Sequence, residues 1–154
     1  MARSILFLLL FLHQLNFMIQ RIQTLWLLLA TVTSFLSIRL PFYSGFHQLE
    51  MTQSILTGQS STVILIFSVL TGLVSFIAVF LFKNRKLQLR LGLGALVSSL
   101  LTIMFYFLEV KKYTNGIYAI TMLVILMAPI CLILALRGIY KDDKLIKSLD
   151  RLRP

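Results

Sequence analysis

Long apolar runs without a charged residue dominate the chain. Three of them contain 18 residues or more and cover 62–82, 91–108 and 116–136, and a fourth, 22–38, contains 17. About 20 helical residues cross roughly 30 Å of hydrocarbon, and these runs lack the alternation of membrane barrel strands. The pattern therefore predicts four transmembrane helices, at about 22–40, 62–82, 91–108 and 116–137.

Composition narrows the class further. The chain is 58% hydrophobic and only 13% charged, and a soluble domain of this length needs more polar residues to cover its surface. We therefore expect an all-α integral membrane four-helix bundle, with residues 18–154 as a single domain.

The basic residues indicate how the bundle is oriented. The net charge is +10, and a cytoplasmic N-terminus would place 12 of the 15 Lys and Arg residues inside, leaving Arg39, Lys111 and Lys112 outside. The positive-inside rule thus predicts that both termini are cytoplasmic. No basic-aromatic stripe indicates nucleic-acid binding, so the surplus charge points to anionic lipid as a partner.

The connections between the spans suggest how the helices pair. Residues 39–61 form an external segment that is long enough to fold over the mouth of the bundle. The segment 109–115 is short, and Asn115-Gly116 is a turn signal. The last two spans are therefore expected to form a tight antiparallel hairpin.

Small and hydroxyl residues recur on one face of each span at helical spacing. Such stripes let membrane helices approach closely, whereas a hydroxyl-lined pore or lipid pocket is the functional alternative. We favour plain packing, because small-residue stripes are the usual interface device. The predicted packing positions are Thr31, Ser34, Ser68, Gly72, Ser75, Gly94, Ser98, Thr102, Ala128 and Ala135.

The C-terminal tail has the pattern of a short amphipathic helix over about 142–153. Gly138 could end or bend the preceding span, and Asp142 is a candidate N-cap. The tail is expected to lie on anionic lipid at the cytoplasmic surface or to dock on a protein partner. Its defining residues are Asp142, Asp143, Leu145, Leu149, Leu152, Arg151 and Arg153.

Candidate chemistry is sparse. His47 and Glu50 lie three apart in the external segment, but two ligands without a second pair favour a solvated loop over a metal site. Glu109 and Lys112 are spaced to form an ion pair. No triad, paired carboxylates near a span, phosphate loop or CxxC motif is present, so we assign no catalytic, cofactor-binding or metal residues.

The two ends of the chain carry a family resemblance. The stretch MIQRIQTLWLLLA from Met18 and the stretch LALRGIYKDDKLIKSLDRLR ending at Arg153 resemble DUF4293, a family of small four-helix membrane proteins typical of Bacteroidota. The resemblance implies a multi-pass protein of the bacterial inner membrane and supplies no catalytic residues. It also implies a start at Met18. Residues 1–17, which look like a signal peptide without a cleavage site, would then be an upstream extension outside the domain.

Three functions remain open from the sequence. The first is a structural or accessory subunit that binds a partner complex or lipids. The second is a small channel or uncoupled transporter lined by the Ser68 and Ser98 faces, and the third is a membrane enzyme acting on lipid. We favour the first, because ion-coupled transport usually needs an ionisable group within a span and the middle of each span contains none.

Overall fold

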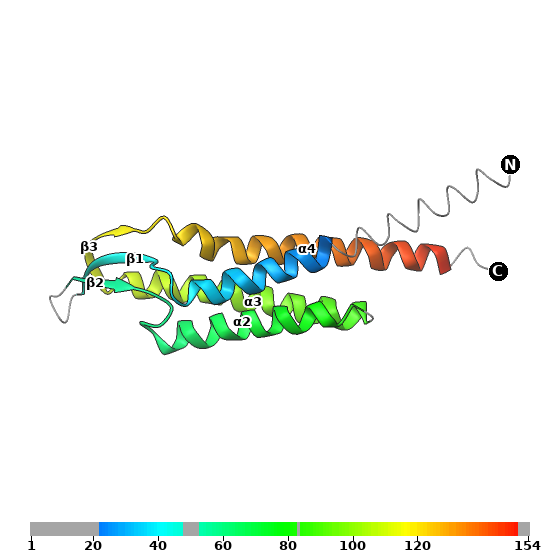
Figure 1. The fold of residues 1–154 in the computed structure, drawn as a ribbon, viewed down its shortest axis with the longest axis horizontal. Coiled ribbons are helices and arrows are strands. Elements are labelled where there is room, and N and C mark those ends of the chain that lie inside the picture. The colour runs from blue at the N-terminus through cyan, green and yellow to red at the C-terminus, as the bar shows by residue number, and fades with distance from the viewer. Residues whose placement is uncertain (1–21, 48–52, 83, 151–154) are drawn as a thin grey trace.

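The computed structural model describes residues 22–47, 53–82 and 84–150, with side chains placed up to Lys144 in the last helix. Helices make up most of this part of the chain. They are a first helix, Ile22–Leu36, followed by α2 (Thr62–Phe80), α3 (Arg85–Val110) and α4 (Met122–Asp150). Figure 1 shows the helices side by side along one long axis, with three short strands at one end and the α2–α3 turn toward the other.

Three of the helices are long and apolar enough to cross a membrane, namely α2, α3 and α4. Large apolar side chains cover their outward surfaces, for example Leu73, Val97 and Ile130, each close to half exposed. An apolar surface of this extent suits lipid rather than water. The four-helix architecture and its membrane character are therefore as expected, although the first helix, described from Ile22, is shorter than a full span.

The expectation of an all-α fold is wrong at one end of the bundle. The strands β1 (Tyr43–His47), β2 (Gln53–Leu56) and β3 (Tyr113–Tyr118) form an antiparallel sheet in the order β2-β1-β3. The segment 39–61 does fold back on itself through β1 and β2, and β1 also pairs with β3 from the connection between α3 and α4. That connection is therefore no tight helical hairpin, and α4 begins at Met122 rather than near 116.

Asn115-Gly116 has a different role from the predicted helix–helix turn. Asn115 adopts φ 51°, in the left-handed region that Asn tolerates better than most residues. It lies in β3, opposite the irregular register between Ser44 and Phe46 of β1. A Cβ on Gly116 would lie 2.4 Å from the Ser44 carbonyl oxygen, so the close approach of these strands requires glycine.

An aromatic core lies at the sheet end of the helices. The rings of Phe42 and Tyr106 are both fully buried, with centroids 4.6 Å apart. The Tyr106 hydroxyl donates a hydrogen bond of 2.9 Å to the Ser37 carbonyl, which links α3 to the end of the first helix. Tyr106 and Tyr43, which is 8% exposed, are thus core residues.

Small side chains fill the space between the helices, as in many membrane bundles. Ala30, Ala78, Ala95 and Ala135 are fully buried in the central cluster. The predicted packing role of Gly94 is wrong, because a Cβ there would meet nothing within 4 Å, whereas one on Gly92 would lie 2.8 Å from Leu136 Cδ2. Residues two positions apart on a helix point about 200° away from each other around the axis. Gly92 therefore faces α4, and Gly94 faces outward.

The last helix does not break at Gly138. It continues without interruption to Asp150, so residues 142–150 extend α4 instead of starting a separate tail helix. Gly138 instead makes room for the first helix, since its Cβ would lie 2.6 Å from Gln23 Cγ. Residues 1–17, like Arg151, Leu152 and Arg153, lie outside the described residues, and the amphipathic face of the tail stays a prediction.

Candidate functional site

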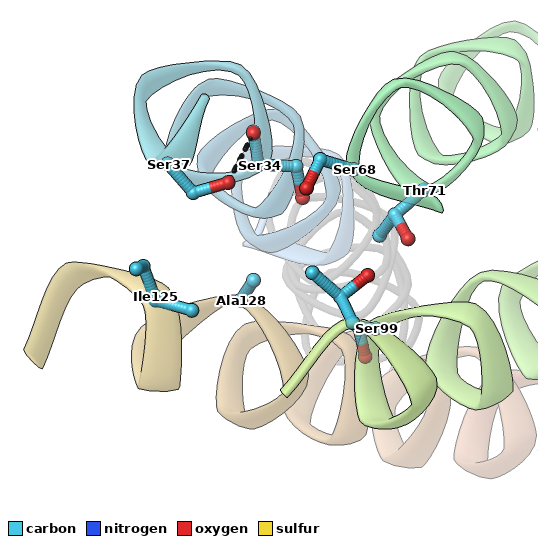
Figure 2. A pocket seen from close by; sticks show the side chains of 8 residues that line it. Ser34, Ser37, Ser68, Thr71, Ser99, Ile125 and Ala128 are labelled. Atoms are coloured by element: carbon cyan, nitrogen blue, oxygen red, sulfur yellow. Dashed lines mark hydrogen bonds between the residues drawn. The ribbon is translucent and has the colours of Figure 1, made fainter. Parts of the chain in front are cut away.

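The central bundle contains a small cavity, and most of the residues that line it carry a hydroxyl group. Figure 2 shows Ser34 and Ser68 pointing into the space between the first helix and α2. The cavity volume is about 10 Å³, close to the least that holds one water molecule. Its lining consists of Ser34, Ser37, Ser68, Thr71, Ser99, Thr102, Ile125 and Ala128.

Most of these hydroxyls donate to a carbonyl of their own segment. Ser34 donates to the Ala30 carbonyl at 2.8 Å, and Ser99 donates to the Leu96 carbonyl at 2.7 Å. Ser37 and Thr102 bond in the same way to Ser34 and Ser98. A hydroxyl that has donated its proton still has two lone pairs, so the hydroxyl oxygens of these residues can still accept a hydrogen bond.

One direct hydroxyl link joins α2 to α3 beside this cavity. The Thr71 and Ser98 hydroxyl oxygens are 2.9 Å apart, and both also lie within hydrogen-bonding distance of the Phe67 carbonyl. Such cross-helix hydrogen bonds are worth roughly 0.6 kcal/mol on average in membrane proteins. The pair therefore fixes the register of the hairpin more than it stabilises the hairpin.

The predicted packing positions, apart from Gly94, are buried in the structure. Ser34, Ser68, Thr102 and Ala128 come together around the cavity. Gly72 faces the ring of Phe35, which a Cβ would approach to 2.9 Å. The predicted packing positions do not include Ser37, Thr71, Ser99 and Ile125, which also line the cavity. Thr71 lies three positions after Ser68 and so shares its face.

A second polar cluster is buried at the end of the bundle away from the sheet. Gln23 Nε2 of the first helix donates to Asp142 Oδ2 of α4 at 2.6 Å. Arg85 Nη1, at the start of α3, lies 3.8 Å from the same oxygen. Gln88 of α3 donates to the Ala78 carbonyl of α2 at 3.0 Å. These side chains connect all four helices at this end.

Asp142 is the clearest correction to the sequence interpretation. It was expected to cap a new helix in the cytoplasm, but it lies within α4 and is only 7% exposed. Burying a carboxylate is costly unless it is paired and hydrogen-bonded, and Gln23 and Arg85 meet that requirement. The missed signal was Gln23 in an otherwise apolar run together with Gly138, one helical turn before Asp142.

The exposed basic residues lie at both ends of the bundle in unequal numbers. Arg137, Lys141 and Lys144 are exposed on α4, and their spacing of four and three places them on one helix face. Lys86 and Arg90 of α3 are exposed toward the same end. The sheet end carries exposed Arg39, Lys111 and Lys112.

The ion pair predicted between Glu109 and Lys112 is confirmed. Lys112 Nζ lies 2.6 Å from Glu109 Oε2, and the Lys112 side chain is 58% exposed. An exposed pair of this kind is worth about 0–1 kcal/mol. It helps to anchor the end of α3 without forming a reactive site.

The weak metal candidate gains no support from the described part of the chain. His47 ends β1 and its ring meets Tyr113 edge to face, with centroids 5.1 Å apart. Glu50 lies outside the described residues. Within residues 22–47, 53–82 and 84–150, no group of three or more His, Cys, Asp or Glu side chains is placed to hold a metal ion.

These features define a class of protein before any comparison is made. Three long apolar helices with lipid-compatible outer faces, small buried side chains and charges gathered at the ends are the marks of a polytopic helical membrane protein. The model of the family described as "Domain of unknown function (DUF4293)" matches residues 19–152. The chain belongs to this family, as its two end motifs suggested. Comparisons with curated proteins and with solved structures give no match.

Proposed function

We propose that this protein is an accessory subunit of the bacterial inner membrane whose basic end binds anionic lipid. The observation that carries the proposal is the exposed face of α4 formed by Arg137, Lys141 and Lys144. The opposite face, with Ile139 and Asp142, is buried against the bundle. The packing of α4 therefore keeps three basic side chains on its outer face. Each would contribute about 1 kcal/mol of binding free energy near an anionic membrane surface.

The orientation of the chain is part of the proposal. The α2–α3 turn and the end of α4 lie at the same end of the molecule (Figure 1), and most of the basic residues accompany them. With this end in the cytoplasm, the sheet faces outward and both termini lie inside. Reporter fusions at exposed Asn84 and Gln59 test this: Asn84 should report the cytoplasm and Gln59 the outside. The reverse result would overturn the orientation.

Lipid binding can be tested by native mass spectrometry of the purified protein. The wild type should retain phosphatidylglycerol in preference to phosphatidylcholine, and the triple variant Arg137→Gln, Lys141→Gln, Lys144→Gln should lose that preference. The matched control is Lys111→Gln, Lys112→Gln, which removes exposed charge from the sheet end. Equal retention by the triple variant and the wild type would contradict the lipid proposal.

The partner form of the proposal gives a different outcome in purification. A protein that co-purifies in constant proportion in mild detergent, and that the triple variant no longer retains, would make the α4 face a docking site for that protein. Leu145 and Leu149 would then be the next positions to substitute, because they follow the three basic residues along α4.

A small channel or uncoupled transporter is the second candidate, and the hydroxyl-lined cavity is the observation that favours it. A channel needs a continuous wet path on both sides of Ser68 and Ser98. Single cysteines at these two positions, in a Cys131→Ala background, should then react with water-soluble thiol reagents in membranes. Unreactive cysteines at both positions would argue against a channel.

A further inference from the structure

Ser68 presents a hydrogen-bonding problem that its neighbours do not. It is 1% exposed, and its Oγ has no hydrogen-bond partner among the described residues. Ser34 faces the same cavity and solves the problem by bonding the carbonyl four residues earlier. A buried hydroxyl left unpaired within a membrane span is unfavourable. Ser68 differs from the equally unpaired Ser75 because it lines a cavity, so another group can complete its hydrogen bonding.

We infer that the cavity binds one ordered water molecule, held by Ser68 and by lining hydroxyls of the neighbouring helices. The water would accept the Ser68 proton and donate its own two protons to hydroxyl oxygens such as those of Ser34 and Ser99. Both of these oxygens have already donated to carbonyls and have lone pairs to accept with. Three hydrogen bonds are the usual number for a buried water.

The size and the chemistry of the cavity both select water. A volume of about 10 Å³ suits one water molecule and is far too small for a lipid chain. The lining side chains are all uncharged, so a bound cation would lie within the span without a countercharge, which is costly. An apolar guest would leave the Ser68 hydroxyl unpaired.

The water has a definite structural role in this arrangement. The pair Thr71 and Ser98 already links α2 to α3 by a direct hydroxyl contact. A water at Ser68 would provide the corresponding link between α2 and the first helix, at nearly the enthalpy of a direct hydrogen bond. It would thereby hold the first helix against the α2–α3 hairpin.

The chain offers a matched control for the test. Ser75 lies on the same helix, is fully buried and also has an Oγ without a partner among the described residues, but it does not line the cavity. Removing an unpaired hydroxyl should be neutral or stabilising. Removing one that binds water should be destabilising. Ser68→Ala should therefore lower the Tm in detergent, whereas Ser75→Ala should leave it unchanged or raise it.

A direct measurement keeps the inference falsifiable if either variant folds poorly. In micelles, NMR should show cross-relaxation between a long-lived water and amide protons near residue 68 in the wild type and in Ser75→Ala, and loss of that signal in Ser68→Ala. Absence of the signal in the wild type would overturn the inference, and so would equal Tm changes in the two variants. A Tm that rises with sodium but not with choline at equal ionic strength would also overturn it, in favour of a cation.

Discussion

The two ends of the bundle are closed by different kinds of interaction. At the sheet end, a folded segment supplies Phe42, which packs against Tyr106 in an apolar core, and the charged pair Glu109–Lys112 stays near the surface. At the other end, Asp142 is buried, accepts a hydrogen bond from Gln23 and forms an ion pair with Arg85. In the described residues no sheet covers this second end.

The difference shows how each end satisfies its buried groups. Pairing between the strands β2, β1 and β3 satisfies backbone amides and carbonyls of the connecting segments. Apolar side chains can therefore fill the space between the sheet and the helices. Where only helix ends meet, the helices are joined through side chains, and buried polar side chains need partners of their own. The sheet end should therefore be sensitive to lost volume, and the basic end to lost hydrogen bonds.

The largest effect is expected from Phe42→Ala. Removing a fully buried ring leaves a cavity, and such changes typically cost about 3–5 kcal/mol. Denaturant unfolding in detergent measures the change. Phe46→Ala is the control, because Phe46 lies on the adjacent strand β1 and is 47% exposed. Similar losses in the two variants would mean that the aromatic cluster does not carry the stability of this end.

Asp142→Ala tests the other end. It leaves the Gln23 amide and the Arg85 guanidinium without their carboxylate, and hydrogen bonds to charged groups are worth about 1.5–3 kcal/mol. Unfolding of Asp142→Asn should show a smaller loss, since an amide oxygen can still accept from Gln23. The neighbouring exposed residue gives the control Lys141→Ala. An Asp142→Ala protein as stable as the wild type would remove the basis for the comparison.

Gly138→Leu tests whether close packing of the first helix on α4 supports the contacts of Asp142 with Gln23 and Arg85. The new side chain would push Gln23 away from Asp142, and overpacking of this kind costs about 1–3 kcal/mol. Gly94→Leu is the matched helical control and should change stability by no more than about 0.5 kcal/mol, because open space surrounds that position. Thermal unfolding of the two variants decides the point. A destabilised Gly94→Leu alone would mean that this face of α3 is covered.

The smallest effect is expected from Lys112→Ala. Its ion pair with Glu109 is partly exposed, so the loss should be about 0–1 kcal/mol and should shrink further at high salt. Unfolding at low and high ionic strength measures both features. A loss as large as that of Asp142→Ala would show that the charged groups at the two ends contribute alike, contrary to the contrast drawn above.

Part of the candidate site was predictable from helical periodicity. Ser34, Ser68, Thr102 and Ala128 were identified because small residues recur on one face of each span, and helical geometry fixes which side chains share a face. Periodicity does not fix which face meets a neighbour when small residues lie on more than one side. The spacing therefore favours Gly94, whereas Gly92 makes the contact in the structure. Whether the Ser68 hydroxyl finds a partner depends on the positions of four helices at once, because all four line the cavity.

By itself, the sequence determined the class of the protein, its helical architecture and its family. Uncharged runs must be helical to satisfy their backbone in lipid, the two end motifs identify the family, and the spacing of Glu109 and Lys112 makes their pairing local. Only the tertiary structure decided the sheet and the burial of Asp142. Tyr43 of β1 pairs with Tyr118 of β3, and Gln23 bonds to Asp142, which follows 119 residues later. Pairing over such a distance leaves no local periodicity, because it arises from where the helices bring their ends together.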